Sequence, residues 1–385
     1  MKILIVGENN KGGGAYQQSL KYLKILTEIK EFKFNFLNTT NNTDDKNFIN
    51  YKLNFLDKLF FMFYSSNSIK ILLKKFKIKN RFEKFVHKNK FDLILFFGNL
   101  RLSLFCEKIN YVTYIYEFHH FFRPDLPEYK GWTDYDFREN LLINNIKKSL
   151  ALIVDTEKKA SDLIKYYNCN NSKINIIPLS PNIITSKIDK ISDENNFDFT
   201  KKFFFYPAQY WSLKNHYYIL LAIKILNEKF NQSVNFIFTG SKNKNFKYLN
   251  KKVNDFGLSK QILFLKYLKD EEISFLYKNC EALVMPSLVG YSSLPLYEAF
   301  YYEKPIFYTK NLLDKSLQKF VNEIDVENPQ DLANQIYNFN KNRDIMNDKI
   351  KLAKKFFNEN LIDEKIQNKY FGLFNKLKYL TDIYE

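Results

Sequence analysis

Three kinds of residue are scarce in this chain of 385 residues: cysteine, glycine and arginine. The three cysteines, Cys106, Cys169 and Cys280, lie far apart and form no CxxC pair. This spacing argues against a disulfide framework or a zinc site and favours a reducing compartment. A long uncharged apolar run is also missing, and the opening MKILIVGENN lacks the core and cleavage site of a signal peptide. We therefore expect a cytoplasmic protein without a membrane span.

Arginine contributes only five of the 59 basic residues, which leaves 54 lysines and a net charge of +17. Because arginine is the usual reader of base edges, a chain so rich in lysine is not expected to have a nucleic-acid partner. Its positive field suits other polyanions, including an anionic membrane surface. Peripheral contact with the inner face of the plasma membrane and a mere codon bias toward lysine both remain open.

The length of the chain fits two domains, and strands alternate with helices along most of it. An apolar strand at Lys2–Gly7 is followed by a glycine-rich loop and a helix at Ala15–Lys30, and the pattern restarts with a strand at Phe203–Pro207. It predicts an α/β fold with two doubly wound, Rossmann-like domains that face a central cleft. The expected divisions are an N-terminal domain over 1–182, a linker over 183–200, a C-terminal domain over 201–365, and a helix over 366–385 that crosses back to the first domain.

The segment PSLVGYSSLPLYEAFYYEKPIF, residues 286–307, follows a predicted strand and opens a helix. Leu294 and Pro295 begin that helix, and the N–H groups of a first helical turn suit a phosphate. Glu298 lies one turn further on, where a carboxylate can accept hydrogen bonds from ribose hydroxyls. From composition alone, an ordinary helix start with a favourably placed Glu explains the same residues.

This segment resembles the signature of glycosyltransferase family 4, the glycosyl transferases group 1, whose members have the GT-B fold. The matching positions are Pro286-Ser287, Leu294-Pro295, Glu298-Ala299 and Pro305. The first Glu of the family's E-x7-E motif is replaced by Gly290, so the turn that contains Ser292 and Ser293 is similar to a variant of that motif. The resemblance implies that Glu298 binds the ribose of a nucleotide and that Gly290, Ser292 and Ser293 belong to a loop near the sugar or acceptor.

A second match is the stretch from Tyr206 to His216, which is similar to the family's donor-phosphate loop. Lys214 stands where the family has a Lys that binds the diphosphate, and Gln209 stands where most members have an Arg. One cation and one amide form a weaker clamp than two cations. Without the resemblance, Lys214 would be read as a solvated lysine in a surface loop.

The remaining candidates are spread over both domains. The stretch from Tyr116 to His120 resembles a strand end in the family whose last His faces the donor sugar. Since adjacent residues of an extended chain point to opposite sides, we choose His120 for this role, although a structural His is the alternative and a zinc site is disfavoured. The resemblance also implies a sugar or acceptor loop at Gly12, Gly13 and Gly14, and further donor contacts at Gly240, Ser241 and Tyr267.

Together these matches imply a retaining glycosyltransferase that moves a sugar from a nucleotide-diphosphate sugar to a glycan or lipid-linked acceptor. The residues expected to act in catalysis are Lys214, His120 and Glu298, and no metal or other cofactor is expected. Bacterial surface polysaccharide, lipopolysaccharide or capsule, is the expected setting. Two alternatives remain open, a UDP-sugar epimerase-like enzyme on the same fold and a non-catalytic paralogue that binds polyanions.

Overall fold

The computed structural model describes the chain except for residues 8–13, 40–46, 56, 59–60, 62–79, 132–133, 184–187, 189–190, 192–196, 267 and 385. The chain divides into two compact units. Unit 1 contains residues 1–125, 129–180 and 363–385, and unit 2 contains residues 126–128 and 181–362. The chain thus returns to unit 1 at residue 363, two residues before the predicted end of the C-terminal domain.

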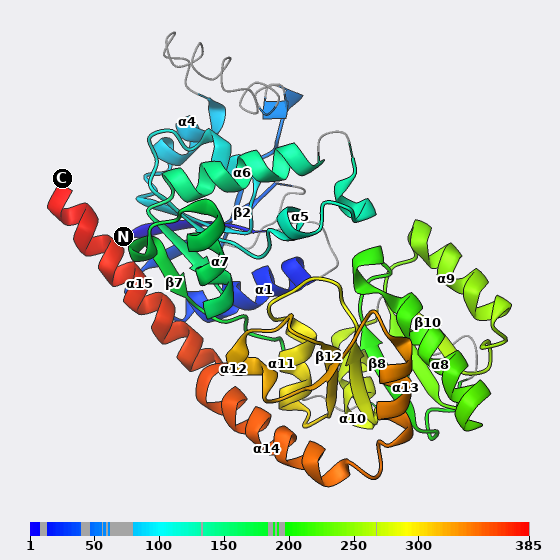
Figure 1. Ribbon diagram of the computed structural model, residues 1–385. Coiled ribbons are helices and arrows are strands. Elements are labelled where there is room, and N and C mark those ends of the chain that lie inside the picture. Colours follow the sequence, from blue (N-terminus) through cyan, green and yellow to red (C-terminus); the bar gives the residue numbers. More distant parts are fainter. Residues whose placement is uncertain are drawn as a thin grey trace. The chain divides into compact units, whose positions relative to one another are not determined.

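Unit 1 is built on a parallel sheet with the strand order β3-β2-β1-β4-β5-β6-β7 in its described part (Figure 1). The strands are β1 Lys2–Val6, β2 Lys33–Asn38, β3 Phe48–Asn50, β4 Leu93–Phe97, β5 Tyr111–Tyr114, β6 Ala151–Val154 and β7 Ile174–Ile176. The helices are α1 Gly14–Thr27, α4 Arg81–Lys88, α5 His119–Phe122, α6 Asp134–Lys148, α7 Glu157–Tyr167 and α15 Asp363–Tyr384, with 3-10 turns at Arg101–Phe105 and Asn171–Lys173.

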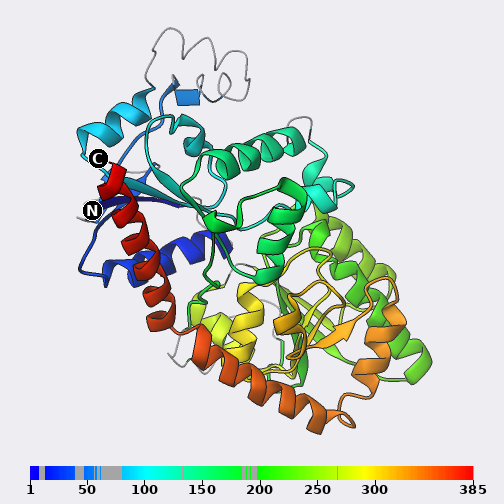
Figure 2. The same cartoon turned by 60° about the vertical axis from the view of Figure 1, so that its left-hand side comes forward.

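Alternate residues of the unit 1 strands serve two separate cores. In β1, Ile3 and Ile5 pack in one core while Leu4 and Val6 pack in the other, as the two-residue period of a strand requires. Helices α1 and α15 cover the first of these faces, and Tyr370 of α15 is fully buried there. Figure 2 shows the red α15 beside the blue α1. Unit 1 therefore takes part of its core from the last described residues of the chain.

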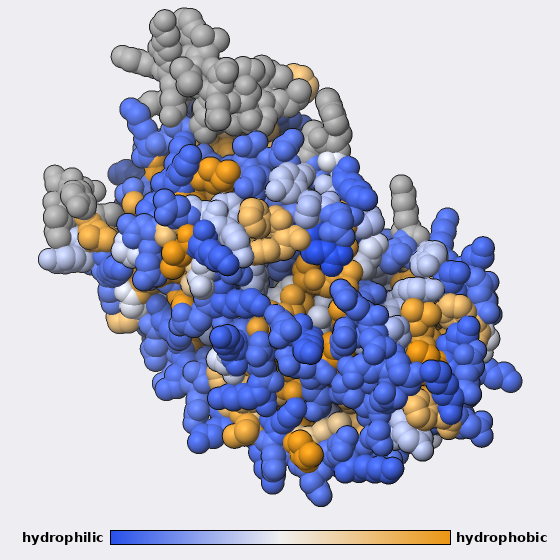
Figure 3. Space-filling view, viewed as in Figure 1, coloured by the Kyte–Doolittle hydropathy of each residue, from blue (hydrophilic) through white to orange (hydrophobic). Residues whose placement is uncertain are grey.

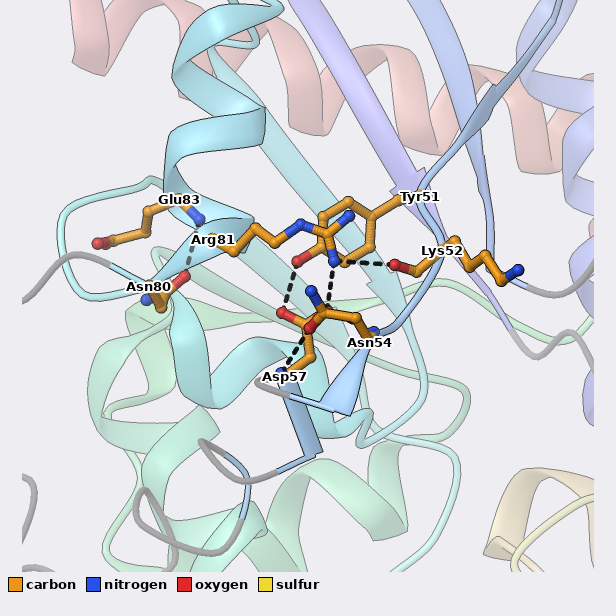
Figure 4. Close-up of polar contacts among 7 residues, drawn as sticks. All are labelled: Tyr51, Lys52, Asn54, Asp57, Asn80, Arg81 and Glu83. Carbon is orange, nitrogen blue, oxygen red and sulfur yellow. Dashed lines mark hydrogen bonds and ion pairs between the residues drawn. The ribbon is translucent and has the colours of Figure 1, made fainter.

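A buried carboxylate joins two segments of unit 1 that lie on either side of residues 62–79 (Figure 4). Asp57 accepts hydrogen bonds from the Tyr51 hydroxyl and from Arg81, each at 2.9 Å. The Arg81 guanidinium also lies 4.9 Å from the centre of the Tyr51 ring. Because Asp57 is paired with both a cation and a hydroxyl, its charge can be buried at the start of α4.

Unit 2 contains a second parallel sheet, with the strand order β10-β9-β8-β11-β12-β13 in its described part. The strands are β8 Phe203–Pro207, β9 Asn235–Thr239, β10 Ile262–Leu265, β11 Ala282–Met285, β12 Ile306–Thr309 and β13 Asn322–Ile324. The helices are α8 His216–Phe230, α9 Lys244–Asp255, α10 Asp270–Asn279, α11 Leu294–Tyr301, α12 Lys315–Gln318, α13 Pro329–Tyr337 and α14 Arg343–Asn360, with a 3-10 turn η4 at Ser212–Lys214.

The central strands of unit 2 are buried along nearly their whole length, which explains their continuous apolar sequences. Both sheets have an order in which the chain first moves outward from a central strand and then restarts on its other side. This is the strand order of a doubly wound Rossmann-like fold, so both predicted domains have the predicted fold class.

Hydrophilic residues cover most of the face shown in Figure 3, and hydrophobic residues form small separate patches on it. Among the residues that the structure describes, no helix combines the length and the apolar character needed to cross a bilayer. From Arg343 onward the described chain forms two helices, α14 and α15, which are separated by Leu361 and Ile362.

Candidate functional site

The candidate donor residues of unit 2 gather where the strand order reverses, between β8 and β11. In open parallel sheets, ligands bind outside the carboxyl ends of the strands at this switch point. The loop after β8 contains Gln209 and Lys214, and the loop after β11 leads through Gly290 to α11. The fold thus brings two motifs together that are about 80 residues apart in the chain.

Direct hydrogen bonds connect these two loops. The backbone N–H of Leu288 donates to the carbonyl oxygen of Leu213 at 2.8 Å. The hydroxyl of Tyr206, buried at the end of β8, donates to the Lys214 carbonyl at 3.0 Å and lies 2.9 Å from the Ser287 hydroxyl. The backbone of Lys214 is therefore fixed to the loop that leads into α11, while the residue itself is half-buried.

Gln209 connects the loop after β8 to the loop after β9. Its side-chain oxygen accepts the backbone N–H of Ser241 at 2.8 Å. Gly240 allows this approach, since a Cβ there would lie only 3.0 Å from the Ala208 carbonyl oxygen and from the Gln209 Cα. The predicted donor residues Gln209, Gly240 and Ser241 thus lie together, and the amide nitrogen of Gln209 is the group left for a ligand.

His216 is buried directly behind the Lys214 turn. Its ring lies 4.8 Å from that of Tyr206 and 5.3 Å from that of Tyr210, centre to centre. Burial lowers the pKa of His216 to about 3, and the nearby charge of Lys214 acts in the same direction. The imidazole is therefore neutral at physiological pH, so Lys214 supplies the positive charge of this turn.

Helix α11 begins as the sequence predicts, but its first turn offers fewer free donors than expected. Ser293 caps the helix, and its hydroxyl accepts the N–H of Leu296 at 3.2 Å. The Tyr297 N–H donates to the Ser293 carbonyl, and Pro295 has no N–H. Of the first helical residues, Leu294 is the one whose N–H is not used in these bonds. The start of α11 alone thus offers few N–H donors to a phosphate, and a phosphate site here would also need Lys214.

Glu298 is half-buried on α11, one turn from the helix start. Its Oε2 accepts a hydrogen bond from the hydroxyl of Tyr277, on α10, at 2.7 Å. Burial raises the pKa of the Glu298 carboxyl to about 7, the hydrogen bond from Tyr277 opposes this, and the charge of Asp270 adds to it. A carboxylate with a raised pKa beside the candidate donor-phosphate loop is more typical of a ligand site than of a solvated helix end.

Gly290 has a backbone φ of +129°, a conformation that residues with a side chain rarely adopt. A Cβ at this position would lie 3.5 Å from the Tyr308 hydroxyl, so the constraint comes from the backbone and not from a lack of space. The backbone of this turn therefore favours Gly at the position where the resemblance leads us to expect the first Glu of the E-x7-E motif. Ser292 and Ser293, the other two predicted residues of the loop, follow it into α11.

In unit 1, His120 does not lie on an extended chain. The prediction that adjacent His residues alternate between two sides was wrong, because β5 ends at Tyr114 and residues 119–122 form the short helix α5. His120 is buried, and its Nε2 lies 3.0 Å from Oε2 of Glu139, which also accepts the Tyr167 hydroxyl at 2.9 Å. Burial lowers the pKa of His120, and Glu139 opposes this shift. The role of His120 toward a sugar stays a prediction.

Three predicted residues, Gly12, Gly13 and Tyr267, lie outside the described part of the chain, and Gly14 is the first residue of α1. Sequence reasoning missed Tyr206, Ser287 and Tyr277, which hold Lys214 and Glu298 in place. Tyr206 and Ser287 stand inside the quoted motifs and could have been considered. Tyr277 lies on another helix with no motif around it, so only the fold reveals it. Among the described residues, no group of three acidic, His or Cys side chains could hold a metal ion.

Comparison with solved structures identifies the fold as that of GT-B glycosyltransferases. Sucrose-phosphate synthase from Thermosynechococcus elongatus has a TM-score of 0.75 at 13% identity, with 98% of this chain and 99% of that chain covered. Anabaena HepE in complex with UDP-glucose has a TM-score of 0.67 at 15% identity, with 98% of this chain and 100% of that chain covered. WaaG, a glycosyltransferase involved in lipopolysaccharide biosynthesis, has a TM-score of 0.65 at 11% identity, with 96% of this chain and 99% of that chain covered.

A family model also matches part of the chain. Residues 187–356, most of unit 2, match the model of the glycosyl transferases group 1. The matched range contains the Lys214 turn, the Gln209–Ser241 contact and the Glu298 helix. No curated protein sequence gives a significant match. By the family match and the fold together, the chain is a glycosyltransferase.

Proposed function

We propose that this glycosyltransferase takes its sugar from a nucleotide-diphosphate donor bound in unit 2. The observation that supports this most directly is the hydrogen bond from Leu288 N–H to the Leu213 carbonyl, which holds the Lys214 turn beside the loop leading to Glu298. One ligand can then bind both, with its diphosphate at Lys214 and its ribose at Glu298. HepE, which has the same fold, binds UDP-glucose.

In the proposed reaction the chain's own residues stabilise the leaving group. The bond between the anomeric carbon of the sugar and the diphosphate oxygen breaks, and negative charge builds on the diphosphate. We assign the stabilisation of this charge to Lys214, with further hydrogen bonds from the Gln209 amide nitrogen and the Leu294 N–H. Because His216 is neutral, it adds no second cation to the turn.

We further propose that the enzyme retains the anomeric configuration, as implied by the resemblance to glycosyltransferase family 4. The acceptor hydroxyl attacks the anomeric carbon on the face that the diphosphate leaves, and its proton passes to a diphosphate oxygen. This assignment requires no metal ion or other cofactor. The Gly290 turn replaces the family's first Glu, so this chain would hold its donor sugar without that carboxylate.

The acceptor is proposed to be a glycan or lipid-linked glycan of a bacterial surface polysaccharide, such as lipopolysaccharide or capsule. WaaG acts in lipopolysaccharide biosynthesis and has the same fold. The net charge of +17, carried mostly by lysine, suits an acceptor held at an anionic membrane surface. The proposal places the enzyme in the cytoplasm, in peripheral contact with the inner face of the plasma membrane.

Donor binding is tested first by a thermal-shift screen of UDP, GDP, ADP and CMP sugars with the full chain. We expect one nucleotide diphosphate to raise the melting temperature, because a ligand that binds only the folded state stabilises it. Transfer is then tested with that donor and bacterial surface glycans, with the anomeric configuration of the product read by NMR. Conversion of the donor into another nucleotide sugar, without transfer, would overturn the proposal and support an epimerase-like reaction.

A further inference from the structure

Tyr277 is a buried tyrosine of α10 whose hydroxyl is directed at the carboxylate of Glu298. The distance from its Oη to Glu298 Oε2 is 2.7 Å, and the distance to the Pro295 carbonyl oxygen is 3.3 Å. A tyrosine hydroxyl has one proton to donate, so the shorter contact is the principal hydrogen bond. One of the two Glu298 oxygens is therefore already occupied before any ligand binds.

The ring of Tyr277 is held from two other elements, so its hydroxyl has little freedom to move. It packs edge-on against Phe205 of β8, with ring centres 5.2 Å apart. It also stacks on Tyr302, at the end of α11, with centres 5.2 Å apart and planes 11° from parallel. Tyr302 is in turn fixed by a hydrogen bond from its hydroxyl to Ser274 Oγ at 2.9 Å. This aromatic packing therefore fixes the position of the Tyr277 hydroxyl that donates to Glu298.

We propose that Tyr277 is a positioning residue for donor binding, which holds Glu298 through Oε2 so that Oε1 is left to accept the ribose hydroxyls. This inference rests on the proposed function of the site. It also explains the fully buried hydroxyl of Tyr277, because a buried polar group needs a partner and a strong acceptor lies within reach.

The same hydrogen bond affects the charge of Glu298. Burial and Asp270 raise the pKa of Glu298, and the bond from Tyr277 lowers it. Asp270 itself, the first residue of α10, accepts a hydrogen bond from Asn182 at 3.0 Å, and burial and Glu271 raise its pKa. Around Tyr277, Cys280 and Tyr302 are the other titratable neighbours. Removing the tyrosine hydroxyl should therefore raise the pKa of Glu298 and leave it protonated at a higher pH.

The test is Tyr277→Phe, which keeps the ring packing and removes only the hydroxyl. With the nucleotide diphosphate that binds wild type, we expect its Kd to rise about tenfold at neutral pH, since a hydrogen bond to a charged group is lost. The KM for the donor should rise likewise, with kcat within about twofold. The pH at which donor affinity is half lost on acidification should be higher in the variant than in wild type.

Two further variants separate positioning from a merely structural role. Tyr302→Phe keeps a ring stacked on Tyr277 and removes only the bond to Ser274, so it should move the pH midpoint less than Tyr277→Phe does. In a Glu298→Gln background, Tyr277→Phe should weaken donor binding by less than twofold, because the carboxylate it positions is gone. An unchanged Kd and pH midpoint in Tyr277→Phe would overturn the inference about Tyr277. Donor binding by wild type in the same experiment would leave the proposed function intact. Failure of wild type to bind any nucleotide diphosphate would overturn both.

Discussion

The side-chain oxygen of Gln209 accepts the backbone N–H of Ser241 at 2.8 Å, and this contact gives an amide a structural role at the position where the resemblance leads us to expect Arg. A guanidinium has no acceptor, so Arg could not hold the Ser241 N–H. Gln supplies an acceptor to the protein and keeps an N–H donor for a ligand. Gln209 therefore holds the loop after β9, and the proposed diphosphate site has one positive charge fewer than it would have with Arg.

Two substitutions of Gln209 should separate these roles. In Gln209→Glu a carboxylate oxygen can still accept the Ser241 N–H, but the N–H donor is replaced by negative charge. We expect the free energy of unfolding of Gln209→Glu to lie within about 1 kcal/mol of that of wild type. Its affinity for the donor should be at least tenfold weaker than that of Gln209→Ala. Isothermal titration with the nucleotide diphosphate and chemical denaturation measure the two effects. If Gln209→Glu bound the donor better than Gln209→Ala, the side chain would not face the diphosphate.

Lys214→Ala should reduce kcat/KM by about 100-fold or more, because it removes the cation that we propose stabilises the leaving diphosphate. Lys224→Ala is a matched control, since Lys224 lies on the helix α8 that follows the turn and pairs with Glu228 at 3.7 Å. An exposed pair of this kind contributes little, so the control should keep its activity. Steady-state kinetics with the identified donor compare the two variants. A loss of twofold or less in Lys214→Ala would mean that the diphosphate binds elsewhere.

Glu298 makes the stability of the ligand-free protein depend on pH. Its pKa is about 7 in the folded chain, against an ordinary value of 4.5. Between these two values the folded state keeps a proton that the unfolded state has lost, so stability falls as the pH rises. The free energy of unfolding of Glu298→Gln, relative to wild type, should therefore increase by about 1–2 kcal/mol from pH 5 to pH 8, allowing for solvent at this half-buried residue. Urea denaturation at both pH values measures it, and a constant difference would contradict the raised pKa.

Gly290 and Gly372 should respond in opposite directions to the same change. Gly290→Ala forces a side chain into a φ of +129° and should destabilise unit 2 by about 1–3 kcal/mol. Gly372→Ala, at an exposed position within α15 with open space around the added Cβ, should stabilise by about 0.5–1 kcal/mol. Gly290→Glu should be destabilised like Gly290→Ala, although it introduces a carboxylate at the position that the resemblance aligns with the first Glu of the motif. Equal melting temperatures for Gly290→Ala and wild type would show that the turn tolerates a side chain.

Much of the fold could be predicted because parallel sheets impose a simple pattern on the sequence. The strand Phe203–Pro207 is predicted with the bounds that the structure has, since it is a short apolar run buried on both faces. The edge strands Phe48–Asn50 and Asn322–Ile324 were missed, because three residues with mixed polarity give no such signal.

The site was predictable where its residues belong to contiguous motifs, and not where partners come from elsewhere. Lys214 and Glu298 could be placed at loop and helix starts from the sequence alone. The partner of Glu298 could not be predicted, since Tyr277 lies 21 residues earlier on another helix. His120 was placed on an extended chain because α5 is a single turn, too short for a periodic pattern to reveal.

Helix α15 has a consequence for how this protein is made. It buries Ile366, Tyr370 and Phe374 in the same core as Ile3 and Ile5 of the first strand. During synthesis on the ribosome, the sheet of unit 1 leaves the exit tunnel without this part of its core, and all of residues 181–362 are translated before the missing helix arrives. Domains that are continuous in sequence fold in the order in which they are made. Here unit 1 is synthesised first but cannot be completed until α15 is made. The face of its sheet that α15 covers therefore stays exposed to other chains while unit 2 folds.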